Sequence, residues 1–168
     1  MNLYIACGLT HVPRSVFPEY VAYLHALAEA LRAETIVTNV RYALIDSDPQ
    51  LASRPKSDRA ALCYDWDRRM VEEADLLVAE ASFPSTGLGI ELQIAETSKI
   101  PVVMLVGDHG VNRTNPVHYK NPDHSQHDLQ IGEGIVSLMA LGLPVIRQIV
   151  TYKSYSEAIS GAVSAVGA

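Results

Sequence analysis

The stretch from Leu76 to Leu92 constrains the fold more than any other part of the sequence. It opens with a short, bounded apolar run, Leu76 to Ala79, which is typical of a strand buried on both faces of a parallel sheet. The run is followed by a break at Phe83-Pro84-Ser85, by Gly87 and Gly89, and then by apolar spacing that favours a helix. A strand, a small-residue loop and a helix start together can present main-chain N–H groups to an anion.

The rest of the chain repeats this alternation of strand and helix. Further strands are predicted at Leu3–Cys7, Glu34–Val40, Ile100–Val106 and Val145–Tyr152. Helices are predicted from about Ser15 or Pro18 to Arg32, over Arg59–Glu73, from the glycine loop to about Ser98, over Ile135–Leu141, and over Ser154–Val166 with Ser154 as the N-cap. Two polar stretches, Ile45–Asp58 and Gly107–Gly134, are interpreted as a surface loop and as an insertion.

Alternating strands and helices favour a parallel sheet with right-handed crossovers and helices on both faces. The chain of 168 residues therefore predicts a single α/β domain over residues 1–168, a flavodoxin-like or Rossmann-like sheet of about five strands with a polar insertion at about 107–134. The dinucleotide fingerprint is absent, because the glycine-rich element follows a central strand and no acidic residue ends the second strand.

Composition excludes several classes of function. The net charge of -6 argues against binding of a nucleic-acid polymer, which needs clustered Lys and Arg. No basic leader and no apolar run of membrane length are present, so we expect a cytoplasmic protein without a membrane partner. The two cysteines, Cys7 and Cys63, are too few to suggest a disulfide framework or a zinc site.

Two carboxylates are candidates for chemistry. Glu91 falls at the predicted loop–helix junction, in the first turn of the helix, and Asp67 lies on the preceding helix near the same end of the sheet. Paired carboxylates suit glycosyl transfer, in which one acts at the anomeric carbon and the other handles a proton. A helix N-terminus should lower the pKa of Glu91 and keep it ionised. The alternatives are that Glu91 only complements the helix dipole and that Asp67 is an ordinary helix acid facing Arg68 or solvent.

Other groups are weaker candidates. His124 and His127, with nearby acids, lie in a segment with no reason to be helical, and we expect neither a metal nor a cofactor. Tyr4, Tyr64 and Trp66 could stack on a base, although core packing is the simpler role for Trp66. Arg14, in the loop after the first strand, is a possible anion ligand.

These motifs resemble a known family. Asp67 and Asp75, followed by Leu-Val-Ala-Glu-x3-Pro-Ser-x-Gly-x-Gly-x-Glu ending at Glu91, resemble the nucleoside 2-deoxyribosyltransferase superfamily, and most of all its 2'-deoxynucleoside 5'-monophosphate N-hydrolase branch. The resemblance is strong over residues 64–106 and weaker over 3–14 and 137–152. It departs from the branch where the usual strand tyrosine is Ile5, with Tyr4 one residue away.

The resemblance implies roles for individual residues. Glu91 would be the nucleophile or cation stabiliser at C1', and Asp67 would hold the sugar and help to protonate the leaving base. Ser85, Gly87, Gly89 and Gly8 would line the pocket for the phosphate or the 5' side of the sugar, with Tyr4 and Arg14 as further substrate contacts. Ser137 would be a phosphate contact that the neighbouring subunit lends. The last role implies a homodimer or a dimer of dimers with a shared site.

The expected function is cleavage of the N-glycosidic bond of a nucleoside or a (deoxy)nucleoside 5'-monophosphate, with hydrolysis favoured over base exchange. The alternative is a catalytically inactive nucleotide-binding or sensing module of the same fold. Two departures from the branch favour this alternative. The loop Gly8 to Arg14 replaces the short Gly-Ser-Ile-Arg loop of the branch, and the histidine after the second strand is missing, with Val40 and Arg41 in its place. The presence of both Glu91 and Asp67 favours the enzyme, because binding a phosphate needs neither acid.

Overall fold

The computed structural model describes all 168 residues and contains a five-stranded sheet in the order β2-β1-β3-β4-β7. The strands are β1 (Asn2–Cys7), β2 (Asn39–Tyr42), β3 (Leu76–Glu80), β4 (Val102–Gly107) and β7 (Ile146–Tyr152). Every neighbouring pair in this sheet is parallel. The predicted Rossmann-like α/β domain is therefore confirmed.

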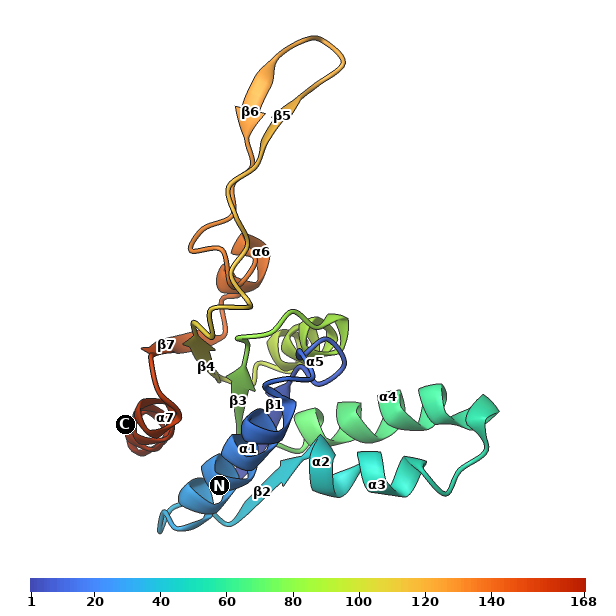
Figure 1. The fold of residues 1–168 in the computed structure, drawn as a ribbon. Coiled ribbons are helices and arrows are strands. Elements are labelled where there is room, and N and C mark those ends of the chain that lie inside the picture. Colours follow the sequence, from blue (N-terminus) through green and yellow to red (C-terminus); the bar gives the residue numbers. More distant parts are fainter.

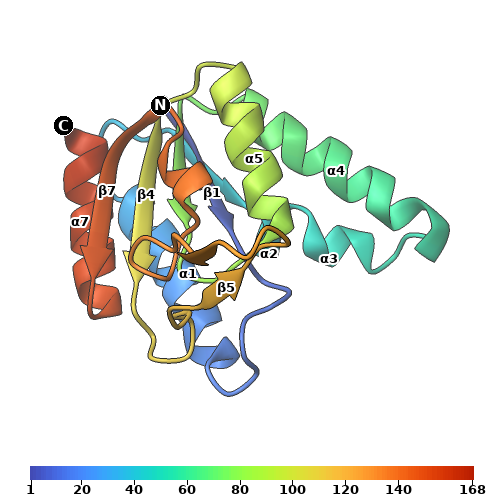
Figure 2. The same cartoon turned by 90° about the horizontal axis from the view of Figure 1, so that it is seen from above.

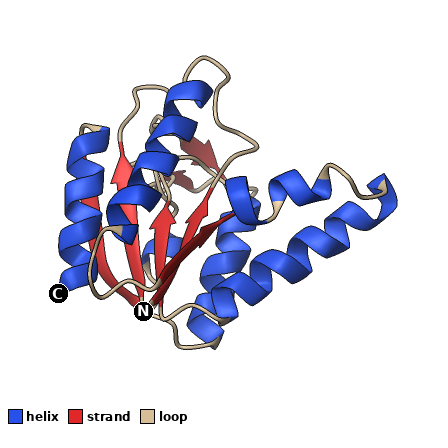
Figure 3. Cartoon of the chain, turned by 90° about the horizontal axis from the view of Figure 1, so that it is seen from below, coloured by secondary structure: helices blue, strands red, loops and turns tan.

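Helices cover both faces of the sheet (Figures 1 and 3). Helices α1 (Phe17–Arg32) and α7 (Tyr155–Gly167) pack on one face, and α4 (Lys56–Glu72) and α5 (Thr86–Thr97) pack on the other. Ser154 caps α7 as predicted, with its hydroxyl accepting the N–H of Glu157 at 3.3 Å.

Strand alternation assigns each buried side chain to one of two cores. In β1, Leu3 and Ile5 face the α1/α7 core, whereas Tyr4 and Ala6 face the α4/α5 core. The same rule holds in the central strand β3, where all five side chains are buried because both faces are covered. Strand β3 is thus held in place by packing on both of its faces.

The segment between α1 and α4 differs from its prediction. The β-branched residues Thr35 to Val37 suggested a strand over Glu34–Val40, but the strand occupies Asn39–Tyr42, because Asn39 is the first residue that pairs with β1. The predicted loop Ile45–Asp58 is largely helical: α2 (Ala43–Asp46) ends inside it, it contains α3 (Asp48–Leu51), and α4 begins inside it at Lys56. This α2–α3 segment and the outer part of α4 project together beyond the β2 edge of the sheet (Figures 2 and 3).

The polar segment after β4 forms a hairpin that extends away from the body of the domain (Figure 1). Its strands are β5 (His118–Lys120) and β6 (Gln126–Asp128), which pair antiparallel. Before the chain leaves the body, the side-chain amide of Asn112 donates to the carbonyl oxygens of Ser82 at 2.7 Å and Gly107 at 2.8 Å.

The chain returns from the hairpin through a short helix, α6 (Leu138–Leu141), instead of the predicted helix over Ile135–Leu141. Ser137 is the N-cap of α6, so the helix cannot include the residues before it. None of the helices combines the length and the apolar character that a membrane crossing requires.

Candidate active site

Glu91 projects from α5, which starts at the carboxyl end of the central strand β3. Ser85 caps the helix, because its hydroxyl accepts the N–H of Leu88 at 3.2 Å. The helix begins at Thr86, so Glu91 lies in its second turn and not in the first turn that the sequence suggested. The side chain is therefore positioned by the packed face of the helix and not by its exposed N-terminus.

The carboxylate of Glu91 is buried, with 9% of the residue exposed. Tyr4, on the neighbouring strand β1, donates its hydroxyl to Oε1 of Glu91 at 2.6 Å. The other oxygen, Oε2, has no hydrogen-bond partner in the protein. Tyr4 reaches the acid because it faces the α4/α5 side of the sheet, whereas Ile5 faces the opposite core. Tyr4 is itself buried and therefore orients Glu91 instead of stacking on a base.

The pKa of Glu91 is raised to about 8, which contradicts the lowering expected from the helix N-terminus. Burial is the largest cause, because it disfavours the ionised carboxylate. The hydrogen bond from Tyr4 opposes this shift, and the negative charge of Asp67 adds to it. The site thus holds an acid that ionises near neutral pH, a property common among catalytic carboxyl groups.

Asp67 comes from α4 and faces Glu91 across a cavity instead of facing Arg68 or solvent. Its two oxygens are held separately: Ser47 donates its hydroxyl to Oδ1 at 2.7 Å, and Cys63 contacts Oδ2 with its thiol at 3.3 Å. Ser47 lies between α2 and α3 and is 1% exposed. Burial, and to a smaller extent the carboxylate of Asp67, raises the pKa of Cys63 to about 12, so this residue acts as a neutral thiol donor.

The two acids line a cavity of about 400 Å³ between α5, α4 and the α2–α3 segment. This volume lies within the range of small-molecule sites. The cavity brings together four of the predicted site residues, Asp67, Ser85, Gly87 and Glu91. Other lining residues include Cys7, Leu9, Thr10, Ser47, Asp48, Cys63, Tyr64, Arg68 and Ile90.

Five predicted contacts lie outside this lining: Tyr4, which bonds Glu91 directly, and Gly8, Arg14, Gly89 and Ser137. Gly8 is packed under the loop: a Cβ there would lie 3.0 Å from both the carbonyl oxygen of Phe83 and the Cβ of Ser85. Only glycine lets the loop after β1 approach the loop after β3 this closely. Gly89 faces open space on the side of α5 away from the acids, and Arg14 is exposed with its guanidinium 5.2 Å from the ring of Phe17.

Ser137 is also separate from the acids. It is exposed and lines a hollow on the other side of α5, together with Gly89 and Ala140. A single chain therefore does not bring Ser137 to Glu91.

Sequence reasoning missed Ser47, which holds Asp67. A lone serine in a polar stretch with two prolines gives no periodic signal, so nothing in the sequence marked it. Cys63 was detectable, since it stands four residues before Asp67 and shares its helical face. No group of three or more His, Cys, Asp and Glu side chains is arranged to hold a metal ion.

A second buried carboxylate lies on the opposite face of the sheet. Glu80 is 0% exposed and accepts three hydrogen bonds: from the hydroxyls of Tyr23 at 2.8 Å and Tyr152 at 3.1 Å, and from the N–H of Ser82 at 3.0 Å. Burial raises its pKa, and these donors oppose the shift.

Comparison with known proteins places the chain in a family, although no family model matches it. Three curated relatives are each named "Putative 2'-deoxynucleoside 5'-phosphate N-hydrolase 1". The relative from Syntrophotalea carbinolica is 49% identical over 45 residues, covering 27% of this chain and 32% of that protein. The relative from Methanosarcina mazei is 37% identical over 59 residues, covering 35% and 37%. The matches thus span about a third of the length of these two relatives.

The third relative, from Thermofilum pendens, is 32% identical over 106 residues, covering 62% of this chain and 67% of that protein. Two solved structures share the fold. The Clostridium botulinum CMP N-glycosidase BcmB has a TM-score of 0.56 at 13% identity, covering 96% of this chain and 97% of that one. A conserved protein from Enterococcus faecalis V583 has a TM-score of 0.54 at 18% identity, covering 96% and 98%. The chain belongs to the nucleoside 2-deoxyribosyltransferase superfamily, in its 2'-deoxynucleoside 5'-phosphate N-hydrolase branch.

Proposed function

We propose that the protein cleaves the N-glycosidic bond of a nucleoside or a (deoxy)nucleoside 5'-monophosphate, with Glu91 as the nucleophile. The observation that carries this proposal is the state of Glu91: one oxygen is held by Tyr4 and the other is left without a partner beside a cavity of about 400 Å³. The names of the relatives, N-hydrolase and N-glycosidase, support the same bond as the target.

The reaction has two steps. In the first, the single proton of the pair, which Glu91 holds at neutral pH, moves to Asp67. Oε2 of the ionised Glu91 then bonds to C1' while the bond from C1' to the base nitrogen breaks, and the departing nitrogen takes the proton from Asp67. In the second, water attacks C1', returns a proton to Asp67 and frees Glu91 as a carboxylate. The products are the free base and the sugar.

The residues around the acids have distinct roles in this scheme. Tyr4 fixes the rotamer of Glu91 and stabilises its anion through the hydrogen bond of 2.6 Å. Ser47 and Cys63 hold the two oxygens of Asp67, so that its carboxyl group keeps one orientation while the base leaves. Half-exposed Tyr64 lines the same cavity and offers a ring face to the base.

The 5' side of the sugar fits the start of α5. Ser85 and Gly87 line the cavity there, and a bare glycine backbone lets a phosphate or a hydroxyl approach the helix N-terminus. We propose hydrolysis over base exchange, with water as the acceptor that resolves the glycosyl-enzyme.

The experiment is a search for free base by chromatography after incubation with a panel of ribo- and deoxyribonucleosides and their 5'-monophosphates. Release of base from at least one compound by the wild-type chain, and not by Glu91→Gln, is the expected result. Adding a second base separates the two acceptors, because only a transferase forms a new nucleoside. Tight binding without base release from any compound would instead identify the inactive binding module.

We further propose that the working unit is a homodimer or a dimer of dimers, with Ser137 serving the site of the neighbouring copy. The position of Ser137 supports this, because within one chain it lies on the other side of α5 from Glu91. Beside it, Leu138 and Met139 are exposed, Met139 by 88%. Analytical ultracentrifugation measures the assembly, and a monomer with full activity would refute the shared site.

A further inference from the structure

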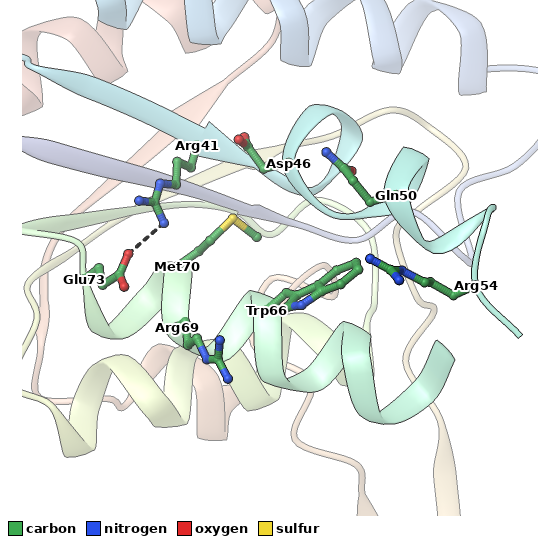
Figure 4. A pocket seen from close by; sticks show the side chains of 8 residues that line it. All are labelled: Arg41, Asp46, Gln50, Arg54, Trp66, Arg69, Met70 and Glu73. Atoms are coloured by element: carbon green, nitrogen blue, oxygen red, sulfur yellow. Dashed lines mark hydrogen bonds and ion pairs between the residues drawn. The ribbon is translucent and has the colours of Figure 1, made fainter. Parts of the chain in front are cut away.

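A second cavity, of about 320 Å³, lies on the other side of α4 from the two acids (Figure 4). We call it the Arg–Trp pocket. It is formed between α4 and the chain from β2 to Arg54, three residues beyond the end of α3. Its lining residues are Arg41, Asp46, Gln50, Arg54, Trp66, Arg69, Met70 and Glu73.

The pocket concentrates positive charge in an acidic protein. Three of the nine arginines line it, against two carboxylates, Asp46 and Glu73, although the chain has a net charge of -6. Arg41 is neutralised by Glu73 at 2.7 Å, as Figure 4 shows. Arg54 and Arg69 have no carboxylate within ion-pair distance. Two guanidinium groups without counter-ions in one cavity favour an anionic ligand, because the planar guanidinium matches phosphate and carboxylate geometry.

The pocket also offers an aromatic surface. Trp66, the chain's single tryptophan, is partly exposed there, and the guanidinium carbon of Arg54 lies 6.0 Å from the centre of its ring. In Figure 4 the side chain of Arg54 points toward the indole. Indole and guanidinium planes both stack on flat rings, so the cavity suits a ligand that has a ring as well as a negative charge.

The pocket is distinct from the proposed active site but shares its walls. Along α4, Trp66 lines the Arg–Trp pocket and the next residue, Asp67, lines the active-site cavity. Along the α2–α3 segment, Asp46 lines the first cavity and Ser47 the second. The hydrogen bond between Ser47 and Asp67, which both line the active-site cavity, joins the two segments that separate the cavities.

From this arrangement we propose that the Arg–Trp pocket is a second binding site, which takes a small aromatic anion of the nucleoside monophosphate class. The negative group of the ligand pairs with Arg54 and Arg69, and its ring stacks on the flat faces of Trp66 and Arg54. A cavity of about 320 Å³ is at the lower end of the range for small-molecule sites, which suits one nucleotide and not a dinucleotide.

Trp66 makes the test direct, because its fluorescence is the only tryptophan signal in the protein. Adenosine 5'-monophosphate is titrated into the full chain carrying Glu91→Gln, so that no bond is cleaved during the measurement. We expect a saturable change in the fluorescence of Trp66. Adenosine, which lacks the charge, and inorganic phosphate, which lacks the ring, should each bind at least about tenfold more weakly.

The matched variants decide where the nucleotide binds. Replacing Arg54 and Arg69 together by Ala should weaken the titration at least about tenfold, since two charge-assisted contacts are lost. Lys56→Ala removes a nearby exposed charge that lines neither cavity, and it should leave the midpoint unchanged. Circular dichroism of each variant confirms that it is folded.

Three results would overturn the proposal: no fluorescence change, a midpoint unaffected by loss of Arg54 and Arg69, or phosphate alone binding as tightly as the nucleotide. The proposal goes beyond the proposed function and does not depend on it. Base release is scored on the unmutated chain, so a protein that cleaves nothing can still show the arginine-dependent titration, and an active enzyme can fail to show it.

Discussion

The protein buries two glutamates on opposite faces of one sheet, and they differ in how completely the surroundings satisfy them. Glu80, on the α1/α7 side, is 0% exposed and accepts hydrogen bonds from Tyr23, Tyr152 and the N–H of Ser82. Glu91, on the α4/α5 side, accepts one hydrogen bond, from Tyr4, and borders a cavity. Burial raises the pKa of both.

The difference teaches that burial alone does not mark a reactive carboxylate. A buried acid whose oxygens are all occupied by donors stabilises the fold, because removing it leaves those donors unpaired. A buried acid with one free oxygen beside a cavity has been desolvated without being satisfied, and a substrate can supply the missing partner. Glu80 therefore serves as the structural counterpart against which Glu91 can be tested.

The largest effect is expected from Glu91→Gln. The amide keeps the size of the side chain but cannot attack C1', so turnover should fall by about a thousandfold or more. The melting temperature should stay near that of the wild type, because a neutral amide is not penalised by burial. Steady-state assays of base release and calorimetry measure the two quantities. Full turnover by this variant would exclude Glu91 as the nucleophile.

The converse is expected for Glu80→Ala. The substitution leaves three buried donors without an acceptor, and we expect a loss of about 3 kcal/mol in the free energy of unfolding. Denaturant titration measures this loss. At a temperature where the variant is folded, its kcat should stay within about threefold of the wild type, since Glu80 faces away from the cavity. A variant that is stable but inactive would reverse the roles assigned to the two glutamates.

The pH dependence tests the rate and the stability separately. The pKa of Glu91 is raised from 4.5 to about 8, and the first step needs the one proton that Glu91 passes to Asp67, so kcat/KM should fall as pH rises through 8 and this proton is lost. The folded chain binds more protons than the unfolded chain between these values, so the free energy of unfolding should fall over the same interval.

Tyr4→Phe sharpens this pH test. It removes the hydrogen bond that stabilises the anion of Glu91, and the midpoint of the rate profile should therefore move to higher pH. The fall in the free energy of unfolding with rising pH should be smaller in Glu91→Gln than in the wild type, because glutamine cannot ionise. A rate that is flat between pH 6 and 9 in the wild type, with chemistry limiting, would contradict the role of Glu91.

The smallest effect is expected from Ser47→Ala. Asp67 then keeps only the thiol of Cys63 as a donor, and loss of one hydrogen bond of about 1 kcal/mol should lower kcat by about fivefold. Ser53→Ala is the matched control, because that hydroxyl bonds only the nearby carbonyl of Gln50. Both rates come from the base-release assay, and equal rates for the two variants would show that Ser47 does not support Asp67.

Part of this arrangement could be predicted from the sequence. The run from Leu76 to Leu92 predicted the strand, the glycine loop and the helix, because a doubly covered strand and a cap followed by helical spacing are local signals. The predicted helices alone placed Asp67 and Glu91 near the same end of the sheet. The parallel sheet then brought the two side chains to one cavity, as expected at the carboxyl ends of such strands.

What the sequence could not give depended on tertiary contacts. The edge strand β2 starts where pairing with β1 starts, which the β-branched residues before it do not reveal. The direction of the pKa shift of Glu91 was wrong, because the helix begins five residues earlier and burial dominates. The role of Ser47 required knowing that the α2–α3 segment folds back against α4.

Asn112 joins the ends of β3 and β4 with a single amide, just before the hairpin leaves the domain. These hydrogen bonds lie at the base of the β5–β6 hairpin, so the ends of β3 and β4 are held together without any contact from the hairpin itself. The projecting arm can then be shortened, lengthened or replaced by a foreign sequence while the catalytic half of the molecule keeps its shape, which makes it a natural place to graft a tag or a tether.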